Sequence, residues 1–202
     1  MSEADKQKWD KKYAEGAYEA KTHPAVFLAD QLASITAALR EARIPEPWRA
    51  LDLACGAGRN SHFLSTNGFE VDAIDISAVG LARAAENAPP NTPGINWLCH
   101  DLDEFDANEF GRYHLIIMMR YVNLPLLKSV THNLHPGGFI LCEKHLRTDE
   151  SVVGPRNPAF RVAPGELKQA LSTLKIHYYE ESIITEPDNN KAAVARVLAQ
   201  QN

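Results

Sequence analysis

The residues best suited to chemistry lie in one short segment, Asp52-Leu53-Ala54-Cys55-Gly56-Ala57-Gly58-Arg59-Asn60. In this segment an apolar run passes into a helical pattern through two glycines, which permit a tight turn and let a ligand lie against the main chain. Asp75 ends the next apolar run, where a carboxylate can accept hydrogen bonds from both hydroxyl groups of a ribose. Asp101 follows a third run, where it would lie beside an adenine. Together these features predict an adenosine-binding site.

The same residues bear on which adenosine ligand is bound. A dinucleotide site usually has a third Gly or Ala where the helix packs on the strand, and this chain has Ser61 there. Asp52 inside the first run would add nothing to pyrophosphate binding, whereas a ligand with a cationic amino-acid tail would gain from it. No GxxxxGK[ST] segment occurs, so a P-loop is excluded.

The elements that must position these residues alternate between strand and helix. Strands are expected at about 50–54, 69–75, 95–99, 113–119, 139–145, 176–184 and 192–198, and helices at 77–85, at 125–134 and from Pro164-Gly165-Glu166 through Leu174. Strict alternation favours a doubly wound, Rossmann-like parallel sheet with crossover helices. The last two strands are joined only by a short polar link, so the final strand should run antiparallel.

Length and composition place the chain among ordinary globular proteins. The sequence has 202 residues, 45% of them hydrophobic, and a net charge of −5 from 21 Lys plus Arg and 26 Asp plus Glu. We expect one domain, with N-terminal helices over 1–44 and an α/β core over 45–202. The acidic balance argues against broad nucleic-acid binding, and we expect neither a membrane span nor a signal peptide, because no apolar run is long enough for either.

The cysteines and histidines give no sign of a metal site or a disulfide framework. Cys55, Cys99 and Cys142 lie singly in apolar segments, where Cys99 and Cys142 are expected to be small buried residues in a reducing, cytoplasmic setting. The eight histidines form no metal-ligand motif.

The segment 52–60, with Asp75-Ile76-Ser77, Asp101-Leu102 and Pro136-Gly137-Gly138, resembles the class I S-adenosylmethionine-dependent methyltransferases over about residues 48–145. The chain is also similar to the small tellurite-resistance-like branch, itself similar to the thiopurine methyltransferases. The segments that carry this narrower similarity are Trp9-Asp10-Lys11-Lys12-Tyr13, Arg120-Tyr121 with Pro125-Leu126, Arg156-Asn157-Pro158-Ala159-Phe160 and Pro164-Gly165-Glu166-Leu167.

The resemblance implies a seven-stranded sheet with an antiparallel last strand and S-adenosyl-L-methionine as the cofactor. It also assigns positions to residues: Asp52 and Gly56 at the methionyl end, Asp75 at the ribose, Asp101-Leu102 at the adenine, and Met119 and Arg120 under the sulfonium. Two residues depart from the family pattern, His114 where Asp is common and Asn123 where relatives often have His. The change at Asn123 bears on substrate choice.

Methyl transfer from a sulfonium needs alignment more than proton transfer, so a base is required only if the acceptor arrives protonated. The candidates near the mouth are Tyr121, Glu143 and His145, although a structural role for His145 fits equally well. Trp9 and Tyr13 either anchor the first helix in the core or form a lid over the site. The basic residues of 144–175 slightly outnumber the acidic ones, and Arg147, Arg156 or Arg161 would attract a small anionic substrate if it turned inward.

These observations predict a single-domain methyltransferase that acts on a small molecule, such as a thiol or an oxyanion, by direct displacement. An RNA or protein methyltransferase and a non-catalytic adenosine-binding module stay open, as does the choice between monomer and homodimer. The candidate catalytic residues are Arg120, Tyr121, Glu143 and His145. The candidate cofactor-binding residues are Trp9, Tyr13, Asp52, Ala54, Gly56, Gly58, Asn60, Asp75, Ile76, Asp101, Leu102, Met119 and Arg120.

Overall fold

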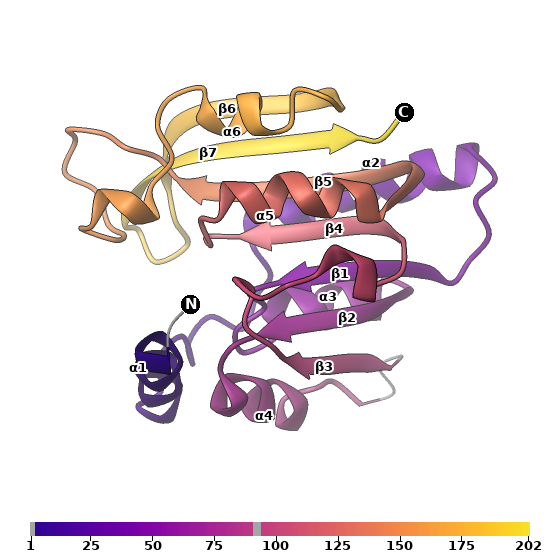
Figure 1. The fold of residues 1–202 in the computed structure, drawn as a ribbon. Coiled ribbons are helices and arrows are strands. Elements are labelled where there is room, and N and C mark those ends of the chain that lie inside the picture. Colours follow the sequence, from indigo (N-terminus) through magenta and orange to yellow (C-terminus); the bar gives the residue numbers. More distant parts are fainter. Residues whose placement is uncertain (1–2, 91–93) are drawn as a thin grey trace.

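The computed structural model describes residues 3–90 and 94–202, which form a seven-stranded sheet between helices (Figure 1). The strands are β1 (Trp48–Leu53), β2 (Phe69–Asp75), β3 (Ile95–Cys99), β4 (Tyr113–Met119), β5 (Leu134–His145), β6 (Lys175–Thr185) and β7 (Lys191–Gln200). The helices are α1 (Glu3–Ala14), α2 (Val26–Glu41), α3 (Arg59–Thr66), α4 (Ala78–Glu86), α5 (Leu124–Ser129) and α6 (Glu166–Ala170), with 3-10 helices at Ala107–Glu109, Val130–Asn133 and Pro158–Phe160. The predicted loop at 88–94 lies partly outside the described residues.

The sheet has the strand order β3-β2-β1-β4-β5-β7-β6. Strands β1 to β5 are parallel to their neighbours, and β7 pairs antiparallel with both β5 and β6. The predicted doubly wound sheet with an antiparallel last strand is therefore confirmed. The order reverses between β1 and β4, and ligands of such sheets bind beyond the carboxyl ends of the strands at this point.

Helices cover both faces of the sheet and bury two apolar layers. In one layer α2, α3 and α4 pack on the sheet, and in the other α5 and α6 do so (Figure 1). The central strand β4 has no exposed side chain from Leu115 to Met118, as expected for a parallel strand that is covered on both faces. In α2 the apolar residues Leu28, Leu32, Ile35 and Leu39, spaced by four, three and four positions, are all buried in the core.

Helix α1 differs from the other helices because it packs mainly on α4 and lies beyond the carboxyl ends of the strands (Figure 1). Asp10 attaches it there: its Oδ1 accepts hydrogen bonds from the Ser77 hydroxyl at 2.6 Å and from the Val79 N–H at 3.3 Å.

No helix in the described part of the chain is long and apolar enough to cross a membrane.

Three local predictions need correction. The helix expected over 125–134 ends at Ser129 and continues as a 3-10 turn, and β5 starts at Leu134 instead of residue 139. The helix α6 ends at Ala170, although Leu171 and Leu174 beyond it are still buried. Cys99 is exposed because β3 is an edge strand, whereas Cys142 in the interior strand β5 is buried as expected.

Candidate cofactor and acceptor site

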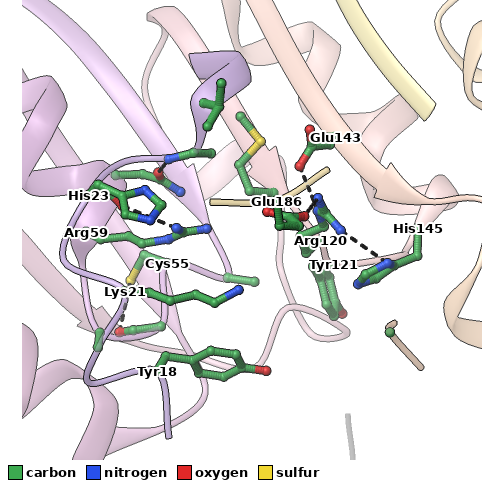
Figure 2. Close-up of a pocket in the computed structure, with 18 of the residues that line it drawn as sticks. Tyr18, Lys21, His23, Cys55, Arg59, Arg120, Tyr121, Glu143, His145 and Glu186 are labelled. Carbon is green, nitrogen blue, oxygen red and sulfur yellow. Dashed lines mark hydrogen bonds and ion pairs between the residues drawn. The ribbon is translucent and has the colours of Figure 1, made fainter. Parts of the chain in front are cut away.

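A cavity of about 750 Å³ lies at the carboxyl ends of β1, β2, β4 and β5 (Figure 2). Residues 9–26 and the turn between β6 and β7 complete its walls. The structure brings together most of the predicted site residues here. Those that line the cavity are Trp9, Tyr13, Ala54, Gly56, Asn60, Asp75, Ile76, Met119, Arg120, Tyr121, Glu143 and His145.

The glycine turn after β1 forms one wall of the cavity. Ala54, Gly56 and Gly58 all have positive φ, between 59° and 78°, so the chain turns sharply before α3 begins. A Cβ added to Gly56 would overlap the Tyr13 hydroxyl, which shows how closely another group approaches the backbone there. The lack of a side chain at Gly56 therefore leaves room for Tyr13.

Asp75 is positioned by this turn. Its Oδ2 accepts a hydrogen bond from the Gly56 N–H at 2.8 Å, and its Oδ1 accepts one from the Ser77 N–H at 2.9 Å. Burial raises the pKa of this carboxyl, while these N–H groups oppose the rise. Two ionised oxygens offer about four acceptor sites, so capacity remains for a pair of ribose hydroxyls.

A second cavity of about 410 Å³ adjoins the first at Ile76, which lines both. Asp101 and His100 line it, and the His100 Nε2 atom is buried without a hydrogen-bond partner among the described residues. Ile76, flanked by His100 and Asp101, has the mixed character that suits a heterocyclic base. The second cavity could therefore take the base of an adenosine ligand whose ribose lies at Asp75 and whose remaining part lies at the glycine turn.

Three residues predicted to contact the cofactor line neither cavity. Asp52 is 1% exposed and accepts a hydrogen bond from the Ser61 hydroxyl at 2.7 Å, while burial raises its pKa to about 7. Leu102 is buried in the core. Gly58 lies against Trp97 and Ala84. Asp52 and Gly58 therefore support the turn from the side of the protein interior, and Leu102 contributes to the core.

Trp9 and Tyr13 both pack in the protein and line the larger cavity. Their rings stack with centroids 6.0 Å apart, and Tyr13 is buried against Gly56 and Gly80. Both also line the larger cavity, which places α1 over the site as a roof. Burial next to Asp75 raises the pKa of the Tyr13 hydroxyl, so it stays protonated.

An ion-pair network forms the opposite wall. The Arg120 guanidinium contacts Glu143 Oε1 at 2.7 Å and Glu186 Oε1 at 2.5 Å, and Arg196 contacts Glu143 Oε2 at 2.7 Å. Arg120 itself has a positive φ of 58°, an uncommon conformation for a residue with a side chain. Figure 2 shows its guanidinium between Glu143, Glu186 and His145.

This network sets the charge states of the candidate bases. Burial alone would raise the pKa of Glu143, but Arg120 and Arg196 outweigh it and hold the pKa below its usual value. Burial and the cations Arg120 and Arg161 lower the pKa of His145 to about 3. His145 Nδ1 lies 3.2 Å from Arg120 Nη1, and since a guanidinium can only donate, Nδ1 accepts and the proton is on Nε2. Burial raises the pKa of Tyr121 to about 12.

The basic segment does not supply the cavity's cations as anticipated. The Arg161 guanidinium donates to the carbonyl oxygens of Pro155 and Leu146, and Arg147 donates to that of Arg161, so both side chains hold the loop 146–162 together. Arg156 is exposed. None of these three arginines lines the larger cavity.

Sequence reasoning missed several charged or polar residues of the cavity lining, and five of them are Lys21, His23, Arg59, Glu186 and Arg196. Arg59 could have been found, because it directly follows the second glycine of the motif. The other four lie in a segment before α2 and in the β6–β7 hairpin, where no motif marks them.

Comparison with known proteins agrees with this geometry. The general pattern of a methyltransferase domain matches residues 50–138. TehB of Haemophilus influenzae, described as a probable S-adenosyl-L-methionine-dependent methyltransferase, is 28% identical over 149 residues, which is 70% of this chain and 51% of TehB. An uncharacterized methyltransferase of Synechocystis, sll0829, is 32% identical over 102 residues, or 48% of this chain and 47% of that protein.

The solved structure of TehB from Haemophilus influenzae superposes with a TM-score of 0.64 at 26% identity, covering 83% of this chain and 62% of that one. The chain spans about half the length of the curated relatives that it matches. The chain thus contains a segment, residues 50–138, that matches a methyltransferase domain, and its fold is that of the class I S-adenosylmethionine-dependent methyltransferases. In sequence and in fold the chain is similar to TehB.

Proposed function

We propose that this protein transfers a methyl group from S-adenosylmethionine to a small-molecule acceptor by direct displacement. The observation that carries this proposal is the shape of the site: a cavity of about 750 Å³ is walled by α1, the following segment and the β6–β7 turn, next to the adenosine-type groups. Such a volume falls in the range of ordinary small-molecule sites. A large RNA or protein acceptor would need an open surface at this position.

The protein's residues hold the adenosine part of S-adenosylmethionine and direct the remainder of that molecule into the larger cavity. In this proposal Asp75 binds the ribose hydroxyls, and Ile76 with Asp101 borders the base. S-Adenosylmethionine, when bound, supplies an activated methyl group whose leaving group needs no proton. Met119 and Arg120, where β4 ends, line the region in which the acceptor would meet that methyl group.

The charge states of the wall residues favour an acceptor that arrives already as a nucleophile. Glu143 is held ionised by two guanidinium groups, and a carboxylate with a lowered pKa is a weak base. His145 is neutral, but its pKa of about 3 gives it little tendency to take a proton. Thiolates and oxyanions need no deprotonation, and the arginines near the cavity would attract them.

To test whether the acceptor is a small molecule, a bacterial cell extract is separated into a small-molecule fraction and a macromolecular fraction. Purified protein and S-adenosylmethionine are added to each, and formation of S-adenosylhomocysteine is measured by mass spectrometry. We expect turnover with the small-molecule fraction, and then with members of a panel of thiols, oxyanions and small carboxylic acids. Turnover with the macromolecular fraction alone would favour an RNA or protein methyltransferase.

Two controls make the outcome specific. Asp75→Ala should lose the activity, which excludes a contaminating enzyme as its source. Binding of S-adenosylhomocysteine without turnover in either fraction would overturn the catalytic proposal in favour of a non-catalytic binding module.

A further inference from the structure

His145 ends β5, and two neighbours fix the position of its imidazole ring. Its Nδ1 atom lies 3.2 Å from the Arg120 Nη1 atom. A Cβ added to Gly154 would lie 2.8 Å from both Nδ1 and Cε1, so the backbone of the loop 146–162 packs closely against this edge of the ring. Figure 2 shows the ring extending toward Tyr121, and both residues line the larger cavity. The other nitrogen, Nε2, is left for the cavity.

This nitrogen is a hydrogen-bond donor that the protein does not use. A guanidinium can only donate, so Nδ1 accepts from Arg120 and the ring proton is on Nε2. Among the residues that the structure describes, no atom accepts a hydrogen bond from Nε2 of His145. A half-buried N–H without a protein partner gains from a ligand atom that accepts its hydrogen bond.

Neither nitrogen of this ring is available as a base. The lone pair of Nδ1 is directed at Arg120, and Nε2 has no free lone pair in this tautomer. Burial, Arg120, Arg161 and Lys21 lower the pKa of His145 to about 3, and Glu143 opposes them only in part. His145 therefore stays neutral and keeps its Nε2–H across the ordinary pH range.

Two of the cations near His145 are only loosely neutralised. In the described part of the chain, the Arg161 guanidinium donates to backbone carbonyl oxygens and has no carboxylate within ion-pair distance. Lys21 has Asp188, 4.0 Å away, in a pair whose side chains are 37% and 47% exposed, and such a pair contributes little. Arg120, by contrast, is paired with two carboxylates. A ligand atom at the Nε2–H would thus lie near positive charge, which favours an anionic oxygen.

We propose that the Nε2–H of His145 binds a carboxylate oxygen of the methyl acceptor, so that the acceptor is a small organic anion. This inference rests on the proposed function, because it names the acceptor class of the same site. One donor and two loosely neutralised cations suit a singly charged carboxylate better than a doubly charged phosphate. The hydrogen bond orients the acceptor, and no proton passes through His145.

Two variants of His145 differ in whether they keep this donor. In His145→Gln the amide N–H can reach the position of Nε2, whereas in His145→Asn the shorter side chain reaches only as far as Nδ1. His132→Gln is the matched control, because His132 is exposed in the 3-10 helix Val130–Asn133 and does not line the cavity.

The assay uses saturating S-adenosylmethionine and, as the acceptor, a dilution series of the small-molecule fraction of a bacterial cell extract. Mass spectrometry follows the formation of S-adenosylhomocysteine. The half-saturating dilution gives an apparent KM, and the plateau rate gives kcat. Both are measured at pH 6, 7.5 and 9.

We expect His145→Asn to raise the apparent KM roughly 10- to 100-fold, the effect of losing a charge-assisted hydrogen bond, with kcat unchanged. His145→Gln and His132→Gln should resemble the wild type. The ratio of apparent KM between His145→Asn and the wild type should be the same at each pH, because a neutral donor does not titrate there. Calorimetric titration should give the same S-adenosylhomocysteine affinity for all four proteins, which also shows that they are folded.

The acceptor class is tested on the small-molecule fraction itself. At pH 6 a carboxylate is ionised and a thiol is not. A quaternary ammonium resin should therefore retain the acceptor activity at pH 6 and release it at pH 2, where carboxylates are protonated. Activity that passes through at pH 6, or that stays bound at pH 2 as a phosphate would, would overturn the carboxylate assignment.

Three kinetic results would overturn the role of His145 while leaving the proposed function intact: an unchanged apparent KM in His145→Asn, an equal loss in His145→Gln and His145→Asn, or a fall in kcat. Failure of the folded wild type to form S-adenosylhomocysteine with the small-molecule fraction would instead overturn the proposed function, and this inference with it.

Discussion

Glu143 shows how single residues set the chemistry of this site. A carboxylate at the end of a strand is a natural candidate for a general base, and the sequence alone presents it as one. In the fold its two oxygens each face a guanidinium, from Arg120 and from Arg196. The side chain therefore orders the wall of the cavity, and its role is to position Arg120.

Asp75 provides the sharpest test of ligand placement at the residue scale. Replacing Asp75 with Ala would remove the proposed charge-assisted hydrogen-bond pair to the ribose, worth about 1.5–3 kcal/mol together, so S-adenosylhomocysteine affinity should fall roughly 10- to 100-fold. Calorimetric titration measures the loss. Asp30→Ala, an exposed position on α2, serves as the control. An unchanged affinity would show that the ribose lies elsewhere.

Lys144 is a second residue whose environment leads to a measurable effect. It has no exposed surface, and its ammonium donates to the Met118 carbonyl oxygen at 2.8 Å. Burial lowers its pKa from 10.5 to about 8. Because the unfolded chain then holds more protons between pH 8 and 10.5, stability should rise with pH through this range.

Lys144→Met should therefore stabilise the protein at pH 7, by up to about 3 kcal/mol given 1.36 kcal/mol per pKa unit. The gain should shrink above pH 8, because the wild-type amine then loses its charge. Urea unfolding of both proteins at pH 7, 9 and 10 measures the difference. A gain that is constant with pH would show that folding does not lower the pKa of this amine.

At the scale of elements, the turn between β1 and α3 depends on Gly58 for packing. Gly58 has a φ of +78°, and an added Cβ would lie 2.6 Å from Trp97 and 2.7 Å from Ala84. Gly58→Ala should therefore cost about 3 kcal/mol of unfolding free energy, from backbone strain and overpacking together. Chemical denaturation provides the measurement.

Gly68→Ala separates the two contributions. Gly68 has a φ of +89° but nothing within 4 Å of an added Cβ, so only strain of about 1 kcal/mol applies. Equal losses in the two variants would contradict the packing role of Gly58.

The elements that carry the site differ in how far the sequence predicts them. The glycine turn and Asp75 are local, since the motif contains both the strand end and the residues that the ligand meets. Glu186 and Arg196 enter the cavity only because β7 inserts between β5 and β6 and brings their hairpin over the strand ends. That contact depends on pairing between distant segments, which no spacing within the hairpin reveals.

At the scale of the whole molecule, ligand binding should stabilise the entire fold. At a concentration of 100 times Kd, a ligand adds about 2.7 kcal/mol to the unfolding free energy. For a chain of this length that raises Tm by roughly 5–10 °C. Differential scanning fluorimetry should show this rise with S-adenosylhomocysteine and no rise with NAD. A comparable rise with NAD would contradict the ligand class.

The sequence predicts the overall topology well because alternating apolar runs and a short final link leave few possible arrangements. Burial is less predictable, as Cys99 shows: its segment is apolar, but β3 is an edge strand and the side chain is exposed. Arg147 and Arg161 likewise depend on tertiary context, since the loop they belong to takes up their donors internally.

The insertion of β7 between β5 and β6 has a consequence for how the protein is made. During synthesis β6 leaves the ribosome before β7, yet it has no hydrogen-bonded neighbour in the sheet until β7 arrives. Arg196 reaches Glu143 at the same step. A nascent chain that ends before residue 191 would thus present an incomplete sheet and an unfinished cavity wall, so the site becomes functional only when this last strand is in place.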